Sequence, residues 1–484
     1  MVAVSSSLKT IFKKTERGIV LIHQYKNNGY NIVLDVYSGA VHVVDELCYD
    51  VIACLNEENE AHTPETLQEG KTFEGLKNAL QDTYSEEELK DALDDVTELA
   101  KNGQLFAKDE YECLIEDVKK RKTVVKALCL HIAHDCNLAC KYCFAEEGEY
   151  HGRRALMDFE TGKKALDFLI ENSGSRRNLE VDFFGGEPLM NWQVVKDLGA
   201  YGREQEKLHD KHFRFTVTTN GVLLNDEIQD FVNKEIDNVV LSLDGRKEVN
   251  DRMRPFRNGK GSYDLIVPKF QKLADSRNQE RYYVRGTFTR DNLDFSNDVL
   301  HFADLGFKQM SIEPVVGPET DPYAIREEDL PVIMEEYDKL AKIMIEREKE
   351  GKGFNFFHFM IDLEGGPCVA KRLSGCGSGT EYLAVTPWGD LYPCHQFVGQ
   401  EEFLMGNVDE GVKRPEIADD FRSCNVYSKE KCKNCFVKFY CSGGCMANAY
   451  NFHGTIHDTY EIGCEMQRKR VECAIMMKAA LADQ

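Results

Sequence analysis

The sequence contains no run of about 18 consecutive apolar residues, so we expect no membrane-spanning helix. Residues 1–10 also lack the apolar segment of a secretory signal peptide. Basic residues are in the minority, with 60 Lys and Arg against 83 Asp and Glu and a formal net charge of −23. This balance argues against a nucleic-acid-binding protein, which normally carries a basic patch, and favours a solvated acidic surface. We therefore expect a cytoplasmic protein with neither nucleic acid nor a membrane as its partner.

Cysteine, by contrast, is abundant. The chain of 484 residues predicts two or three domains, and a hydrophobic fraction of 42% suffices for packed cores. In a secreted protein, the 17 cysteines would suggest disulfides. Here they cluster at metal-binding spacings and no signal peptide is recognised, which indicates thiolate ligands in a reducing compartment.

Residues 1–117 read as a small separate unit. Alternating apolar residues predict strands over 18–25, 30–35 and 40–44, and a helix follows from Asp45 to Leu55. Ser85 and Glu88 form a capping box for a second helix that ends at Gly103, with Leu89, Leu93, Val96 and Leu99 as its buried stripe. Strands followed by short helices suggest a winged-helix-like binding module. A charged linker over 116–122 follows.

Residues 123–350 alternate between strand and helix patterns. The expected strands are Ala127–Ile132, Leu179–Phe184, Phe213–Thr218, Asn238–Leu243, Tyr282–Phe288 and Lys308–Glu313. Six such units predict an α/β fold, a parallel sheet curled into a partial (β/α)6 TIM-like barrel, with active residues just after the strand ends. A long charged helix is expected over 329–352. Residues 351–484 then become rich in Cys, Gly and Tyr, which indicates a region organised by metals.

The most informative motif is Cys136-x3-Cys140-x2-Cys143, which directly follows the first barrel strand. Iron–sulfur clusters are held by Cys thiolates, and a cubane contains four irons. Three cysteines therefore leave one iron free to bind a small molecule. A structural zinc site is the alternative, but zinc takes four ligands, usually from paired Cys knuckles, and no second pair lies nearby.

Small and polar residues follow the next strands. Gly185 and Gly186 would allow a ligand to approach the backbone closely, and Glu187 offers a carboxylate to an amine. Hydroxyl and carboxylate groups that suit a ribose follow the third and fourth strands, among them Thr219, Ser242 and Asp244. Three arginines could pair bidentately with a ligand carboxylate, namely Arg252, Arg254 and Arg285. Taken singly, each residue could equally serve a capped loop or a surface ion pair.

These motifs together resemble the radical S-adenosylmethionine (SAM) superfamily, whose Cys-x3-Cys-x-aromatic-Cys loop matches Cys136, Cys140 and Cys143, with Tyr142 as the aromatic residue. The resemblance implies that the amine and carboxylate of SAM chelate the free iron of a 4Fe–4S cluster. It also implies that reductive cleavage of SAM produces a 5′-deoxyadenosyl radical. By the same resemblance, SAM would be bound by Tyr142, Gly185, Gly186, Glu187, Ser242, Asp244 and Arg254.

The C-terminal cysteines form a second motif. Gly389-x4-Cys394 lies between Cys376 and the run Cys432-x2-Cys435-x5-Cys441-x3-Cys445, and Cys464 follows after a gap. This pattern resembles the SPASM extension, which holds two auxiliary 4Fe–4S clusters. The resemblance implies one cluster on Cys432, Cys435, Cys441 and Cys464, and another on Cys376, Cys394 and Cys445. The fourth ligand of the second cluster is left open between Cys368 and a substrate thiolate. A zinc ribbon is the alternative for the 432–445 run.

His395 is a departure from one branch of this family. In the sulfatase-maturing members, an acidic residue follows the Gly-x4-Cys cysteine and acts as a base, whereas here His395 follows Cys394. This difference puts formylglycine formation in doubt. His395 could accept a proton, and a loop histidine without a catalytic role is the alternative.

The three-part layout most resembles the maturases of ribosomally made peptides, and within them the SCIFF-peptide thioether maturases. The runs that carry this likeness are Gly-Gly-Pro-Cys-Val-Ala-Lys-Arg-Leu-Ser-Gly-Cys-Gly and Thr-Pro-Trp-Gly-Asp-Leu-Tyr-Pro-Cys-His-Gln-Phe. The resemblance implies a Cys-rich precursor peptide that docks by its leader on the N-terminal unit as an added strand, and an external electron donor. Other radical modifications, such as carbon–carbon crosslinking, epimerisation or decarboxylation, are the nearest alternatives. A zinc-stabilised binding protein is an alternative from another class.

Overall fold

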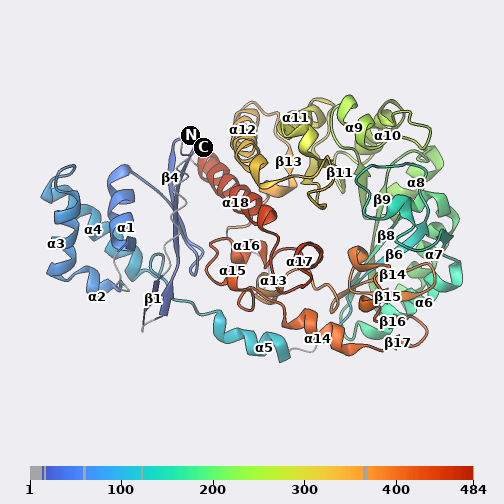
Figure 1. The fold of residues 1–484 in the computed structure, drawn as a ribbon, viewed down its shortest axis with the longest axis horizontal. Coiled ribbons are helices and arrows are strands. Elements are labelled where there is room, and N and C mark those ends of the chain that lie inside the picture. The colour runs from blue at the N-terminus through green and yellow to red at the C-terminus, as the bar shows by residue number, and fades with distance from the viewer. Residues whose placement is uncertain (1–12, 16–17, 58–61, 121–123, 364–368, 483–484) are drawn as a thin grey trace.

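The computed structural model describes residues 13–15, 18–57, 62–120, 124–363 and 369–482, and one large sheet dominates it (Figure 1). Six neighbouring parallel strands form its centre: β6 (Ala127–His134), β8 (Asn178–Gly185), β9 (His212–Thr219), β10 (Asn238–Ser242), β11 (Tyr282–Phe288) and β12 (Gln309–Pro314). All six predicted strands are confirmed to within two residues at either end.

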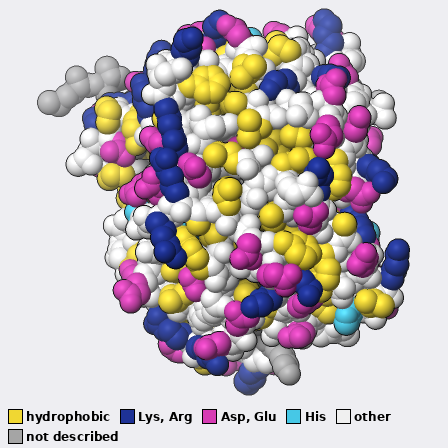
Figure 2. Space-filling model, turned by 90° about the vertical axis from the view of Figure 1, so that its right-hand side faces the viewer, with side chains coloured by type: hydrophobic (Ala, Val, Ile, Leu, Met, Phe, Trp, Pro, Cys, Tyr) yellow, Lys and Arg dark blue, Asp and Glu magenta, His cyan; other side chains and the backbone are white. Residues whose placement is uncertain are grey.

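Helices cover the outer face of this sheet. They are α6 (Phe159–Asn172), α7 (Trp192–His209), α8 (Asp226–Glu235), α9 (Lys247–Met253), α10 (Tyr263–Ser276), α11 (Phe295–Asp304) and α12 (Leu330–Lys349). Phe215 of β9 packs under α7, where the Arg203 guanidinium lies 4.8 Å from its ring centre. Because successive strand residues point to opposite faces, Thr216 and Thr218 face the inside of the curled sheet. Figure 2 shows acidic and basic side chains interspersed over the outside.

The sheet continues into the C-terminal region at both edges. β13 (Asn355–Phe356) pairs in parallel with β12, and β14 (Tyr382–Val385) pairs in parallel with β6. Antiparallel strands follow β14, namely β15 (Asp390–Tyr392), β16 (Gly406–Asn407) and β17 (Gly411–Val412), while β7 (Ala155–Leu156) pairs with β6. The barrel and the region after residue 350 therefore share one sheet.

The C-terminal helices are mostly short, as the sequence suggested: α13 (Val369–Ser374), α14 (Pro415–Ser423), α15 (Glu430–Lys433), α16 (Lys438–Cys441) and α17 (Met446–His453). The exception is α18 (Glu461–Ala482), a helix of 22 residues. It packs along α12, where Lys469 pairs with Asp338 at 2.6 Å and the Arg470 Nε donates to the Tyr337 hydroxyl at 2.8 Å. Within the described ranges, no helix has the length and apolarity needed to cross a membrane.

The N-terminal unit has strands followed by helices, as predicted. Beside the hairpin β1 (Lys13–Thr15) and β2 (Gly18–Val20), an antiparallel sheet contains β3 (Ile22–Asn27), β4 (Tyr30–Asp35) and β5 (Val41–Val44). The helices are α1 (Glu46–Glu57), α2 (Pro64–Leu67), α3 (Gly70–Leu80) and α4 (Glu86–Lys101). The capping box of Ser85 and Glu88 is confirmed. Two helices were missed by the sequence reading, because α2 and the start of α3 lie in a short Pro- and Glu-bearing stretch.

The sheet of this unit is buried on both faces. Ile22 and Val33 pack against α1 and α4 in a small core of their own, whereas Tyr25, Ile32 and Leu34 join the main core of the molecule. On the latter face, the His23 ring stacks on Phe436 with centroids 3.4 Å apart, and its Nε2 lies 2.9 Å from the Glu472 carboxylate. The sheet thus lies between its helices and α18 (Figure 1).

A buried ion pair joins the segment just before the predicted linker to the C-terminal region. Part of that linker is a helix, α5 (Ile115–Lys120). Just before it, the Asp109 carboxylate lies 3.7 Å from the Lys438 ammonium, whose side chain is 0% exposed. Asp109 also accepts hydrogen bonds from the Tyr427 hydroxyl at 2.7 and 2.8 Å. The Lys438 ammonium further lies over the rings of Tyr37 and Phe439.

Replacing Asp109 with Ala would leave the Lys438 charge buried without its carboxylate, which costs about 3 kcal/mol. We expect Asp109→Ala to lower the melting temperature of the metal-loaded chain in calorimetry. The matched control is Asp117→Ala on α5, where the carboxylate is exposed and its loss should change the melting temperature little. Equal melting temperatures for the two variants would contradict this account of the linker.

Candidate functional site

The three-Cys loop leaves the carboxyl end of β6, where the barrel rule predicts an active site. Two backbone hydrogen bonds attach it to the segment after α9: the Ala139 N–H donates to the Pro255 carbonyl at 2.9 Å and the Lys141 N–H to the Met253 carbonyl at 3.0 Å. Arg254 lies between these two acceptors in sequence. The loop is therefore fixed beside the arginine predicted to bind the SAM carboxylate.

Burial disfavours the thiolate form of Cys136 and Cys140. It raises the pKa of Cys136 to about 12 and that of Cys140 to about 11, and neighbouring thiols add to both shifts. The thiolate is the metal-binding form of Cys, and metal binding displaces the thiol proton. Buried thiols in one loop are thus suited to a cationic iron site, with Arg254 also lowering the pKa of Cys140.

The C-terminal cysteines gather in the two groups that the resemblance implied. Burial raises the pKa of Cys394 to about 12, with contributions from Cys445 and Cys376. Burial likewise raises the pKa of Cys432 to about 12, and in that group the neighbouring thiols are Cys441, Cys464 and Cys435. Cys368, the candidate fourth ligand of the group formed by Cys376, Cys394 and Cys445, lies outside the described residues.

The sulfur atoms of the described cysteines are spaced more widely than the ligands of a single zinc ion. Zn–S bonds of about 2.3 Å place the sulfurs of a tetrahedral site about 3.8 Å apart. Among the residues that the structure describes, the only three possible ligands whose atoms all lie within 4.8 Å of one another are His453, Asp458 and Glu461. This trio is already paired, since Lys431 contacts both carboxylates. No three cysteine sulfurs of the described residues come that close.

Gly185 and Gly186 bring two loop backbones together. A Cβ at Gly185 would lie 2.3 Å from the Ala133 carbonyl oxygen, and one at Gly186 would lie 2.2 Å from that of Asp135. The Gly186 N–H donates to Ala133 at 2.7 Å and the Glu187 N–H to Asp135 at 2.9 Å. The sequence reading assigned these glycines to the approach of a ligand. The contacts seen are between the end of β8 and the start of the three-Cys loop.

Glu187 is completely buried and largely engaged. Its carboxylate accepts hydrogen bonds from the Thr219 hydroxyl at 2.8 Å, the Asn220 N–H at 2.8 Å and the Leu189 N–H at 3.0 Å. Burial raises the pKa of this carboxyl group, while these donors lower it. A carboxylate has about four acceptor positions, so one remains for an amine such as that of SAM. Thr219, whose hydroxyl was considered for a ribose, donates to Glu187 in the structure, and together with the Asn220 N–H it holds this carboxylate in place.

Tyr142, Asp244 and Arg254 form one connected group. The Tyr142 hydroxyl donates to Asp244 at 2.7 and 2.8 Å, and the Arg254 Nη1 donates to the Tyr142 hydroxyl at 2.9 Å. Arg254 lies 3.8 Å from the Asp244 carboxylate. Its Nε is buried and has no partner among the described residues, an orphaned donor that fits a ligand carboxylate. Ser242 ends β10 close by.

His395 joins the two cysteine regions. Its ring centroid lies 5.8 Å from that of Phe144, which follows Cys143, and 5.1 Å from that of Phe184 on β8. Its Nδ1 lies 3.2 Å from the Tyr382 hydroxyl. Burial lowers the pKa of His395 to about 4, and the positive charge of Arg285 contributes. The imidazole is therefore neutral at neutral pH and a weak base.

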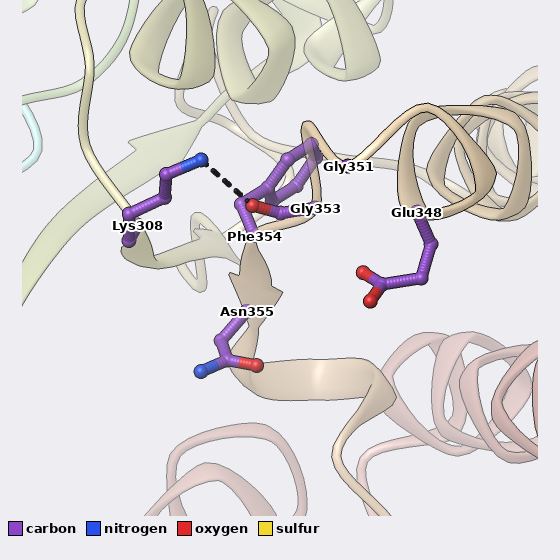
Figure 3. A pocket seen from close by; sticks show the side chains of 6 residues that line it. All are labelled: Lys308, Glu348, Gly351, Gly353, Phe354 and Asn355. Atoms are coloured by element: carbon purple, nitrogen blue, oxygen red, sulfur yellow. Dashed lines mark hydrogen bonds between the residues drawn. The ribbon is translucent and has the colours of Figure 1, made fainter.

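A separate hollow of about 340 Å³ lies at the other end of the barrel (Figure 3). It is lined by Lys308, Glu348, Gly351, Gly353, Phe354 and Asn355. Lys308 precedes β12 and Asn355 begins β13, so the hollow opens at the amino ends of these strands. The Lys308 ammonium already donates to the Gly353 carbonyl at 2.9 Å. The cysteine loops leave the opposite ends of the strands, so this hollow is distinct from the candidate site.

The fold and the site define a barrel whose first βα loop presents three thiolates. Residues 130–284 match the model of the Radical SAM superfamily. The chain is 22% identical to the radical SAM cyclopropyl synthase TigE of Paramaledivibacter caminithermalis, over 71% of this chain and 72% of that protein. It is 24% identical to the cysteine-type anaerobic sulfatase-maturating enzyme of Clostridium novyi, over 68% of this chain and 90% of that protein.

The crystal structure of Streptococcus suis SuiB bound to its precursor peptide SuiA has a similar fold, with a TM-score of 0.51 and 16% identity, covering 93% of this chain and 98% of that one. The α/β fold is therefore that of radical SAM proteins. The match to the Radical SAM superfamily covers residues 130–284, and over most of its length the chain is similar to a radical SAM synthase and to a sulfatase-maturating enzyme. The superfamily implies SAM and a 4Fe–4S cluster as its cofactors.

The sequence reading missed a buried polar group beside the three-Cys loop. His131 and His134 on β6 contact each other through ring nitrogens 2.9 Å apart, and both rings pack against Tyr150. One ring nitrogen of each histidine and the Tyr150 hydroxyl lack partners among the described residues. The two histidines are three positions apart in a strand whose other residues are all apolar and buried. This spacing does not follow the two-residue alternation of a strand, so the sequence did not indicate that they share a site.

Gly186→Ala tests the contact between the loops. Its methyl group would collide with the Asp135 backbone and displace the three-Cys loop, so we expect a loss of at least tenfold in 5′-deoxyadenosine formation from SAM. The control is Gly199→Ala on α7, whose Cβ would meet only Phe231 at 3.6 Å and which should leave SAM cleavage intact. Wild-type cleavage by Gly186→Ala would show that the close approach is dispensable.

Proposed function

We propose that this enzyme forms a thioether between a Cys sulfur and an α-carbon in a ribosomally made, Cys-rich precursor peptide. The observation that carries the proposal is the proximity of the two cysteine loops, with Phe144 and His395 packed between them. A substrate held there would be within reach of both the SAM site and the group of Cys376, Cys394 and Cys445. The similarity to the sulfatase-maturating enzyme of Clostridium novyi, and to SuiB with its bound precursor peptide, supports this class of substrate.

Each cofactor has residues suited to hold it. We propose that Cys136, Cys140 and Cys143 hold the cluster that binds SAM, and that two auxiliary clusters occupy the C-terminal groups. When bound, the first cluster and SAM would supply a 5′-deoxyadenosyl radical that abstracts hydrogen. Glu187 would orient the SAM amine, and Arg254 its carboxylate. The Tyr142–Asp244 pair would hold Arg254 in place, with Ser242 beside the ribose.

The substrate thiol would lie at the auxiliary group nearest to the barrel. Either Cys368 or the substrate thiolate would complete the ligands of Cys376, Cys394 and Cys445. Because thiolates are good iron ligands, the second arrangement would also orient the attacking sulfur. His395 would line this space as a neutral side chain. Forming the bond leaves a surplus electron, which an auxiliary cluster would pass to an external acceptor. An external donor would reduce the first cluster, and a reducing cytoplasm suits such sites.

The leader peptide would bind to the N-terminal unit, which we place within residues 1–117. β5 is an edge of its sheet, paired only with β4 in the described residues, and Val43 on β5 is 52% exposed. An edge strand presents unpaired backbone groups that can pair with a further strand. The barrel over 123–350 and the SPASM region over 351–484 would then act on the core of the same peptide.

The test is anaerobic incubation of the iron-loaded enzyme with SAM, a reductant and a Cys-rich candidate precursor peptide. A product lighter by two hydrogens, with one cysteine no longer reactive, is expected. The wild type should contain about twelve irons per chain, as expected for three cubanes. Cys140→Ala is the control: it should retain the iron of the auxiliary clusters but cleave no SAM. If every thiol of the product stays reactive, the thioether is rejected in favour of another radical modification. Zinc without sulfide would favour a binding protein.

A charged side chain on the β5 edge should block strand addition. We expect Val43→Lys to weaken binding of the fluorescently labelled precursor at least tenfold in an anisotropy titration. Leu208→Lys on α7 is the control, since Leu208 is 72% exposed but lies on the barrel. Unchanged affinity in Val43→Lys would move the leader site elsewhere.

A further inference from the structure

A second group of charged residues lies inside the barrel, on the half of the sheet away from the three-Cys loop. Arg285 of β11 and Glu313 of β12 approach to 4.0 Å, and Arg470 of α18 lies 3.8 Å from the same carboxylate. His358, just after β13, lies 3.4 Å from Glu313 and 3.1 Å from the Ser311 hydroxyl. None of these residues belongs to the proposed SAM site.

This group has an excess of positive charge. Burial lowers the pKa of His358 to about 3, so its ring is neutral. Two guanidinium groups thus face a single carboxylate, and both separations exceed hydrogen-bond length. The Arg470 Nη2 is buried and has no hydrogen-bond partner among the described residues. Glu313 alone therefore does not satisfy the hydrogen-bond donors of Arg285 and Arg470.

Arg285 is the accessible member of the group. Its side chain is 54% exposed, although it lies in the middle of a central strand, and within the described ranges no hydrogen bond from its guanidinium is found. Arg254 differs, because it is 11% exposed and already bonded to Tyr142. Because successive strand residues point to opposite faces and the neighbouring Val284 is buried in the core beneath the helices, Arg285 lies on the inner face of the sheet.

We propose that Arg285, backed by Arg470, binds a carboxylate of the peptide substrate. Guanidinium groups bind carboxylates bidentately and with defined geometry, and a second carboxylate would balance the two arginines. The proposal deepens the proposed function and rests on it, because the bound group belongs to the peptide that is modified. An acidic side chain near the modified residue, or the peptide's C-terminal carboxylate, would be fixed here, and this contact would select the site of reaction.

Three small probes separate these sources: N-acetyl-glutamate α-amide, with a side-chain carboxylate; N-acetyl-glutamine, with a terminal carboxylate; and neutral N-acetyl-glutamine amide. Their binding to the iron-loaded full-length enzyme is measured by ligand-observed NMR, first without SAM and then with SAM added. We expect at least one acid to bind and the neutral amide not to bind. The acid that binds identifies the source. Arg285→Ala should weaken its binding at least tenfold, and Arg285→Lys less.

The matched control is Arg214→Ala. Arg214 of β9 has a similar exposure, 58%, and lies 3.6 Å from Glu180 of β8. This variant should bind the probes as the wild type does. Any of four results would overturn the proposal: the acids and the neutral amide bind equally, neither acid binds, Arg285→Ala binds the acid as tightly as the wild type does, or the acid no longer binds once SAM is added. The last result would assign Arg285 to SAM. Deoxyadenosine formation by the wild type is measured separately, and its absence would refute the proposed function whatever the probes show.

Discussion

The parallel pairing of β14 with β6 is the constraint on which the arrangement of the site depends. β6 carries the three-Cys loop at its end, and β14 leads through β15 to Cys394. Tyr382 pairs with Ala127 in register, and the Lys126 N–H donates to the Glu381 carbonyl at 2.8 Å. Since the register of two strands fixes every side chain along them, it also fixes how far Cys394 lies from Cys136. A slip of one residue would turn Tyr382 away from His395.

The sequence predicted the barrel strands well because each is an apolar run bounded by turn residues and followed by a helical pattern. The cysteine groups were equally clear, since metal ligands recur at fixed spacings. What it could not predict depends on contacts far apart in the chain. Nothing local signals that Tyr382–Val385 joins the barrel sheet, or that His23 stacks on Phe436. The close contact at Gly186 could not be foreseen for the same reason: the atom that forbids a side chain there belongs to Asp135.

The inside of the barrel contains two differently arranged sets of charged groups. On the half formed by β6, β8 and β10, buried carboxylates are fixed by several donors each, as for Glu187, which suits a ligand of constant shape. On the half formed by β11 and β12, Arg285 is loosely held and exposed. A cofactor needs the first kind of site and a variable peptide the second. The aromatic residues Phe144 and Phe184 lie with His395 where the three-Cys loop, β8 and the Cys394 loop meet.

α18 contacts the N-terminal sheet through Glu472 and the barrel helix α12 through Lys469 and Arg470, and it carries Cys464 of one cysteine group. Its partner His23 lies 449 positions earlier in the chain than Glu472. Because α18 is synthesised after every segment it touches, the sheet face bearing His23 and Tyr25 stays uncovered on the ribosome until this helix emerges. During translation, the nascent chain therefore presents this face of the N-terminal sheet to solvent until the C-terminal region has emerged.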